Sequence, residues 1–305
     1  MLSFFAATPA LRMAPPMMQV QQQQTTTTGT GFAGRVVPTK EQVAPMLDSN
    51  KAMIDSLASI APEMPEIERL RFALGFPEQA EAEAALKEAV EWRSGEGKSM
   101  VEAAAAAVAK AVEGGTWDNE PVRMAAPHAA VINPFITPEN ILTLSTADGD
   151  LVYVIRASKI DDKAMMKSVT VDQLVDYLLY VKEVHSLVVN ARSKRSGRLC
   201  NVIFANDITG TRAAPDPLFA KALTASSKSY ERLYPSLAGP TMILNLPFIL
   251  QAFVGLFKPL FPKSVQARLK FEGAPFLKKL DDLTPLTEDP ASRKAFLAEV
   301  EGLLA

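Results

Sequence analysis

The sequence has little of several residues on which common functions depend. Among its 305 residues are one cysteine, Cys200, and two histidines, His128 and His185. A single cysteine excludes an intramolecular disulfide and fits a reducing compartment; because Cys200 lies in a predicted strand, we expect an inert core thiol. The histidines belong to no cluster with metal-ligand spacing. The chain also lacks a G-x-S-x-G motif, so nothing in it points to hydrolytic chemistry of that type.

Strong net charge and long apolar runs are also missing. The formal net charge is -2, which gives no bulk electrostatic attraction to nucleic acid. An apolar stretch runs from Met242 to Phe257, but Asn245, Pro247 and Gln251 interrupt it. It is shorter than the roughly 20 apolar residues that a transmembrane helix needs, so we do not expect it to span a bilayer.

The N-terminal segment lacks acidic residues, since the first one is Glu41. It contains runs of glutamine and threonine at 21–28. An acid-free, hydroxyl-rich and weakly basic start is typical of an organelle transit peptide, and a disordered tail would have the same composition. We therefore predict that residues 1–40 form a disordered tail or a transit peptide. The expected location is the plastid, with the mitochondrion and the cytoplasm as alternatives.

The remainder of the chain alternates between short apolar runs and segments with helical periodicity. Continuous apolar runs at Leu151–Ile155, Val202–Ala205 and Met242–Leu244 are typical of buried parallel strands. Between them, residues 170–190 and 217–234 have helical periodicity. This alternation predicts an α/β layer. The preceding region, residues 43–114, has only helical signals.

The segment between Leu246 and Phe257 carries a single polar side chain, Gln251. A surface helix of a soluble protein shows a polar face, which this segment almost lacks. It is therefore expected to form a helix that is either buried on all sides or lies over an apolar ligand.

Several motifs follow one another in an order that resembles a known family. They are RLRFALGF (69–76), EAALKEAVEWR (83–93), GDLVYVIRASKID (149–161), SGRLCNVIFANDITG (196–210), YPSLAG (234–239), NLPF (245–248), FKPLFP (257–262) and RLKF (268–271). In this order and spacing they resemble the CRAL-TRIO, or Sec14-like, lipid-binding domain over roughly residues 66–273.

The resemblance implies an α/β fold in which a mostly parallel sheet is covered by helices. It also implies an N-terminal helical subdomain and an internal hydrophobic pocket. The expected organisation is an N-terminal helical subdomain at 41–118, a CRAL-TRIO-like lipid-binding domain at 119–275 and a C-terminal helical tail at 276–305.

The resemblance further implies an apolar gate helix over the pocket, at residues 245–260. The expected gate or lining residues are Phe248, Ile249, Phe253, Leu256 and Phe257. The expected floor of the pocket consists of strand residues Val152, Val154, Ile203 and Phe204. His185 shares a helix face with apolar residues and is predicted to lie in the core or to line the cavity.

The chain departs from the family at the positions that bind phospholipid headgroups. Phosphoinositide-binding members carry a glutamate directly after the Tyr-Pro, where this chain has Ser236, and Arg268 is the nearest match to the partner lysine. The hydroxyl pair of phosphatidylcholine binders falls at Val202 and Phe204, which are both apolar. These departures favour a neutral or single-chain hydrophobic ligand, such as a prenyl quinone or a tocopherol-like molecule.

A basic cluster, RSKRSGR, places Arg192, Lys194, Arg195 and Arg198 close together. It is interpreted either as a solvated loop or as a membrane-surface patch that attracts anionic lipid headgroups. No aromatic residues are interleaved, which does not favour binding of single-stranded nucleic acid.

We thus expect a protein that binds a hydrophobic ligand or lipid in an internal pocket and carries or presents it at a membrane. The alternative is a structural or regulatory subunit that keeps the fold and docks on a membrane protein complex without lipid exchange. The expected partners are a hydrophobic small molecule and, transiently, a membrane surface, but not nucleic acid. Neither enzymatic activity nor a cofactor is expected.

Overall fold

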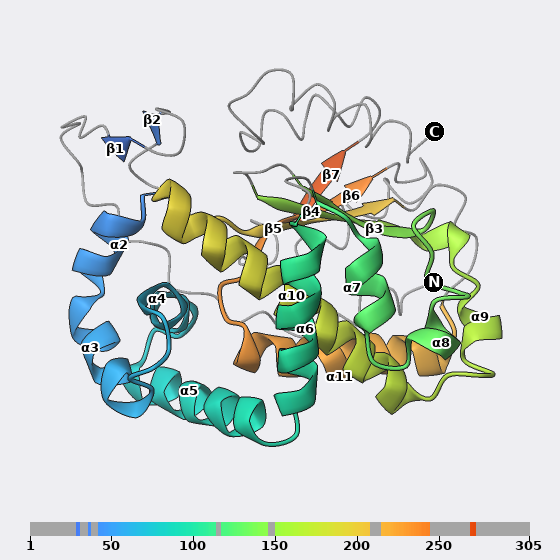
Figure 1. The fold of residues 1–305 in the computed structure, drawn as a ribbon, viewed down its shortest axis with the longest axis horizontal. Coiled ribbons are helices and arrows are strands. Elements are labelled where there is room, and N and C mark those ends of the chain that lie inside the picture. Colours follow the sequence, from blue (N-terminus) through green and yellow to red (C-terminus); the bar gives the residue numbers. More distant parts are fainter. Residues whose placement is uncertain are drawn as a thin grey trace, which may run out of the picture.

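The computed structural model describes residues 29–30, 36–37, 42–113, 117–145, 150–207, 215–244 and 269–272. A five-stranded sheet lies against a layer of helices, and helices from the N-terminal half extend beyond one end of that layer (Figure 1). None of the helices in these ranges is long and apolar enough to cross a bilayer.

The N-terminal half is helical. Its helices are α2 (Val43–Ser49), α3 (Lys51–Ile60), α4 (Glu66–Gly75), α5 (Gln79–Ser94), α6 (Lys98–Ala111), α7 (Glu120–Ala125) and α8 (Ala129–Ile132). Ahead of them, β1 (Gly29–Thr30) and β2 (Val36–Val37) pair antiparallel. Pro65 lies immediately before α4, where a helix can begin without a backbone N–H donor.

The sheet has the strand order β3-β4-β5-β6-β7. Its strands are β3 (Ile141–Ser145), β4 (Leu151–Arg156), β5 (Val202–Asp207), β6 (Ala238–Leu244) and β7 (Leu269–Glu272). β3 pairs antiparallel with β4, and every later pairing is parallel. The predicted α/β class with a mostly parallel sheet is confirmed. The antiparallel edge strand β3 was not among the predicted strands.

Two long helices connect the parallel strands and cover one side of the sheet. α10 (Val171–Ser196) joins β4 to β5, and α11 (Pro217–Leu233) joins β5 to β6. The short elements η3 (Ala157–Lys159) and α9 (Asp162–Met165) lie between β4 and α10. In Figure 1, α10 runs diagonally beneath the sheet, with α11 below it.

α10 begins and ends at clear local signals. Thr170 and Gln173 form a reciprocal capping box at its start. Gly197 ends it with a left-handed φ of 69°, a conformation that glycine adopts without steric cost. The helix therefore extends past Asn190, where the sequence pattern had predicted its end.

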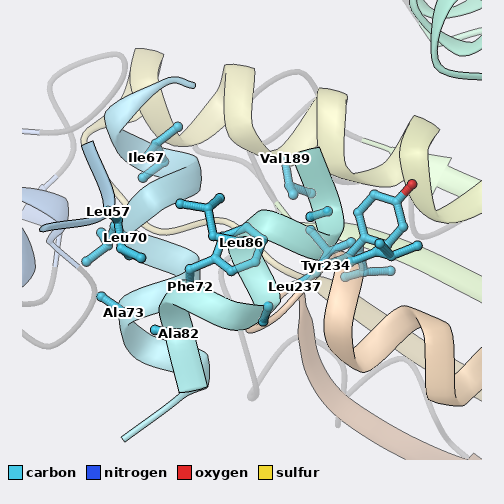
Figure 2. Close-up of a cluster of buried hydrophobic side chains, with 14 of the residues drawn as sticks. Leu57, Ile67, Leu70, Phe72, Ala73, Ala82, Leu86, Val189, Tyr234 and Leu237 are labelled. Atoms are coloured by element: carbon cyan, nitrogen blue, oxygen red, sulfur yellow. The ribbon is translucent and has the colours of Figure 1, made fainter. Parts of the chain in front are cut away.

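The N-terminal helices and the sheet share one hydrophobic core. Leu57 of α3, Leu70 of α4 and Leu86 of α5 are fully buried in the same cluster as Val189 of α10 and Leu237, next to β6. Figure 2 shows these side chains meeting between the helices. The region predicted as a helical subdomain thus packs directly on the α/β layer.

Candidate functional site

The register of the central strands determines which side chains face the helices. Tyr153 pairs with Phe204, and Ile155 pairs with Asn206. Because side chains alternate along a strand, these residues lie on the same side of the sheet. The Tyr153 ring contacts the His185 ring of α10 edge-on, with centroids 4.9 Å apart. This side of the sheet therefore faces α10 and α11.

The four predicted floor residues do not share one side of the sheet. Val152 pairs with Ile203, and Val154 pairs with Ala205, so Val152, Val154 and Ile203 point away from α10. All of these are fully buried, with 0% exposure. Phe204 instead points toward α10, and the predicted floor is divided between the two sides.

Several side chains on the helix side of the sheet keep accessible surface. Phe204 and Ile155 on the strands, and Lys182 and Tyr230 on the helices, are only half-buried. A side chain that borders space accessible to water keeps accessible surface, whereas tightly packed interiors leave none. This accessible surface, the candidate opening, lies between β4, β5, α10 and α11, whereas Val152 and Val154 on the opposite side have none.

Lys182 places a charged amine at this opening. Its Nζ lies 4.1 Å from the centroid of the Phe204 ring, 4.9 Å from that of Tyr230 and 5.5 Å from that of Tyr153. Among the described residues, no carboxylate lies within ion-pair distance of it. Burial lowers the pKa of Lys182 to about 7, while the ring faces act in the opposite sense because they stabilise the ammonium.

Lys182 was not among the site residues predicted from the sequence. A signal for it exists, since Val171, Val175, Leu178 and Lys182 follow one another at intervals of three or four residues. These spacings place them on one face of a helix. A lysine at the end of an apolar stripe indicates a position where charge meets the core.

His185 lies one turn further along α10 and is fully buried. Burial and the neighbouring Lys182 charge lower its pKa well below the ordinary value. The imidazole is therefore neutral at physiological pH and packs against Tyr153. Its position on the helix side of the sheet, next to Lys182, places it near the opening.

A buried arginine network lies where the N-terminal helices meet the Tyr-Pro corner. Arg71 of α4 donates from Nε to Asn190 (2.6 Å), from Nη1 to the Ser236 carbonyl (2.7 Å) and from Nη2 to the Cys200 carbonyl (2.6 Å). A longer bond from Nη1 reaches Asn201 (3.2 Å). Ser236, at the position of the family's headgroup glutamate, has a left-handed φ of 52°. Its backbone is held by Arg71.

A second charged contact joins the N-terminal helices to α10 and to the Tyr-Pro corner. Arg93 of α5 forms an ion pair with Glu183 of α10 at 2.7 Å, and its guanidinium lies over the Tyr234 ring. Glu183 is buried. Removing water from this region raises the pKa of Tyr234 well above its ordinary value.

The predicted basic patch is not a continuous surface patch. Lys194 and Arg195 are exposed, but Arg192 and Arg198 are buried. Arg198 forms a buried ion pair with Asp150 at 2.7 Å. The physical reason is that α10 continues to Ser196, so Arg192, Lys194 and Arg195 point in different directions around the helix. Arg198 follows the helix end and turns inward to Asp150.

Arg268 lies outside the described residues, and so do all five predicted gate residues, Phe248, Ile249, Phe253, Leu256 and Phe257. Cys200 is buried, and this burial raises the pKa of its thiol. Within the described ranges, no cluster of three or more histidine, cysteine, aspartate or glutamate residues could hold a metal ion.

Comparison with known proteins gives a family match. The family model described as the CRAL/TRIO domain matches residues 140–290. Among solved structures, the crystal structure of Sfh5 resembles the chain at 14% sequence identity and a TM-score of 0.34, covering 73% of this chain and 80% of that one. No curated protein matches the sequence.

Proposed function

The chain belongs to the CRAL/TRIO family, and from this premise we propose that it binds its ligand between the sheet, α10 and α11. The domain indicates a lipid or another small hydrophobic molecule as the ligand. We further propose that the protein carries this ligand to or from a membrane.

The observation that carries the proposal is the accessible apolar surface around Phe204. Ile155, Phe204 and Tyr230 are half-buried, so they keep some exposed apolar surface between the sheet and the two helices. Ligand sites in proteins are concave and mostly apolar, with a few polar groups that fix orientation. Here the apolar surface comes from two strands and α11, and Lys182 supplies the polar group.

The position of this space agrees with what the resemblance implies for headgroup binding. The hydroxyl pair of phosphatidylcholine binders falls at Val202 and Phe204, and the strand register places both on the helix side of the sheet. Neither residue offers a hydroxyl group. The choline lipid is therefore a poor candidate, and a ligand with little polar surface fits better.

Carrying a lipid through water requires an apolar enclosure of this kind. Each lipid CH₂ that leaves a bilayer for water costs about 0.8 kcal/mol. A single chain of about sixteen carbons therefore costs on the order of 12 kcal/mol to expose, which the protein must offset by enclosing the chain.

Substitution at the opening tests the proposal. Ile155→Trp should fill the space from the strand side, because Ile155 is half-buried and faces the helices. The wild type, incubated with total membrane lipid and repurified, should retain a hydrophobic molecule that mass spectrometry detects, and Ile155→Trp should retain at least about tenfold less. Val131→Trp, at a side chain 39% exposed on α8, is the matched control and should bind as the wild type does. Equal retention by both variants would contradict this location.

A further inference from the structure

The aromatic box at the opening is occupied by the protein's own cation. Phe204, Tyr230 and Tyr153 all lie within 5.5 Å of Lys182 Nζ, measured to the ring centroids. Groups of aromatic rings like this one bind quaternary ammonium ligands in other proteins. Because Lys182 already fills the box, a cationic headgroup would meet both an occupied site and a like charge.

The same cation lacks a counter-charge among the described residues. The adjacent carboxylate on α10, Glu183, is paired with Arg93 at 2.7 Å. Within the described part of the chain, the charged group of Lys182 contacts three aromatic rings. A charge removed from water is costly unless it is paired. A negatively charged ligand group beside Nζ would supply the missing partner.

The number of donors decides which anion fits. Sites that bind phosphate cluster several donors, often including the bidentate fork of an arginine. Among the described residues around this surface, Lys182 supplies one ammonium, and the neighbouring His185 is neutral because burial and Lys182 lower its pKa. One ammonium compensates one negative charge, which matches a carboxylate.

We propose that Lys182 selects apolar ligands that end in a carboxylate, the class of long-chain fatty acids, by pairing its ammonium with that group. This inference rests on the proposed function, since it names the ligand class of the same site. It also replaces the expectation of a neutral ligand with that of an acidic one.

The pairing of Lys182 with a carboxylate should make the affinity for the ligand depend on pH. Burial lowers the pKa of Lys182 to about 7 in the ligand-free protein, and a bound carboxylate favours the ammonium. Above this pH, binding must take up a proton, so affinity for the acid should fall by up to about tenfold per pH unit. The titratable groups around Nζ are His185 on α10, Tyr153 on β4 and Tyr230 on α11. His185 is neutral and burial raises the pKa of Tyr153, so neither changes charge between pH 7 and 9.

The test compares oleic acid with methyl oleate, which has the same chain and no charge. Affinity of the full-length, delipidated protein is measured by titration from pH 6 to pH 9, with the lipid below its aggregation concentration. The wild type should bind the acid at least about tenfold more tightly than the ester at pH 6.5, a ratio equivalent to roughly 1.4 kcal/mol. This preference should shrink as the pH rises, whereas ester binding should stay constant.

Two lysine variants locate the effect. Lys182→Met should lose the preference for the acid while keeping affinity for the ester. Lys228→Met, at an exposed position on α11, should behave as the wild type. Equal binding of acid and ester by the wild type at all pH values would overturn the inference and leave the proposed function intact. So would a preference that survives in Lys182→Met. If the wild type binds neither lipid, the proposed function fails as well.

Discussion

At the scale of single residues, Arg71 is a buried cation held by four hydrogen bonds. It is 3% exposed, and its guanidinium bonds Asn190, Asn201 and the carbonyls of Cys200 and Ser236. Burial lowers its pKa to about 10, so it remains charged at physiological pH. The charge is solvated by protein carbonyls and amides in place of water, which links α4 to the start of β5 and to the Tyr-Pro corner.

Replacing Arg71 should therefore destabilise the fold. Arg71→Met keeps an apolar stem but leaves the Ser236 and Cys200 carbonyls without their donor. Hydrogen bonds to a charged group contribute about 1.5–3 kcal/mol, and unsatisfied buried groups add to the loss. We expect the free energy of unfolding in urea to fall by about 3 kcal/mol or more. Lys87→Met, at an exposed position on α5, is the control, and a similar loss in both variants would contradict this role.

Replacing Lys182 should stabilise the fold, whereas replacing Arg71 should destabilise it. Its pKa is about 7 when folded and its ordinary value is 10.5, so the unfolded chain binds more protons between these values. Stability from this group therefore rises as the pH increases from 7 to 10.5. In the ligand-free protein, Lys182→Met should raise the melting temperature most at pH 7 and below, and the gain should shrink toward pH 10. A gain that is independent of pH would count against a lowered pKa of Lys182 in the folded protein.

At the scale of secondary-structure elements, close contacts fix how α4 meets the chain after α11. A Cβ added at Gly75, the last residue of α4, would lie 2.5 Å from Cβ of Pro235. That separation is far below van der Waals contact. Gly75 therefore allows the end of α4 to approach the Tyr-Pro corner that Arg71 also holds.

Gly75→Ala should be destabilising even though alanine favours helices. Forced overpacking of this kind typically costs about 1–3 kcal/mol, against a gain of up to about 1 kcal/mol in helix propensity. The midpoint of urea unfolding should thus move to lower concentration. Glu91→Ala, exposed on α5, should leave the midpoint almost unchanged. A higher midpoint for Gly75→Ala would contradict this prediction, because it would show that the Tyr-Pro corner shifts to accommodate the added methyl group.

The elements also show how far the sequence could predict this structure. Apolar runs located β4 and β5, because strands buried on both sides need continuous apolar residues. Which side of the sheet a residue faces depends on how its strand pairs with the neighbouring strand. The sequence alone therefore could not show that Phe204 faces the helices while Ile203 faces the opposite side. Similarly, the charge of the basic cluster favoured either a solvated loop or a membrane-surface patch, yet α10 continues to Ser196 and Arg192 is buried.

At the scale of the whole molecule, the N-terminal helices belong to the same packed unit as the sheet. Their leucines share a core with α10, and ion pairs join Arg93 to Glu183 and Glu88 to Arg232 across the contact. The order of family motifs predicted this architecture. The partners of Arg71, Arg93 and Lys182 lie far away along the chain, and a single sequence gives no contact information between such distant positions.

The overall account places an apolar ligand on the helix side of the sheet, with its polar end at Lys182. The most direct measurement is an experimental structure of the protein loaded with its retained lipid. The account predicts ligand density between β4, β5, α10 and α11, in contact with Phe204 and with an oxygen atom beside Lys182 Nζ. Density on the opposite side of the sheet, against Val152 and Ile203, would contradict it.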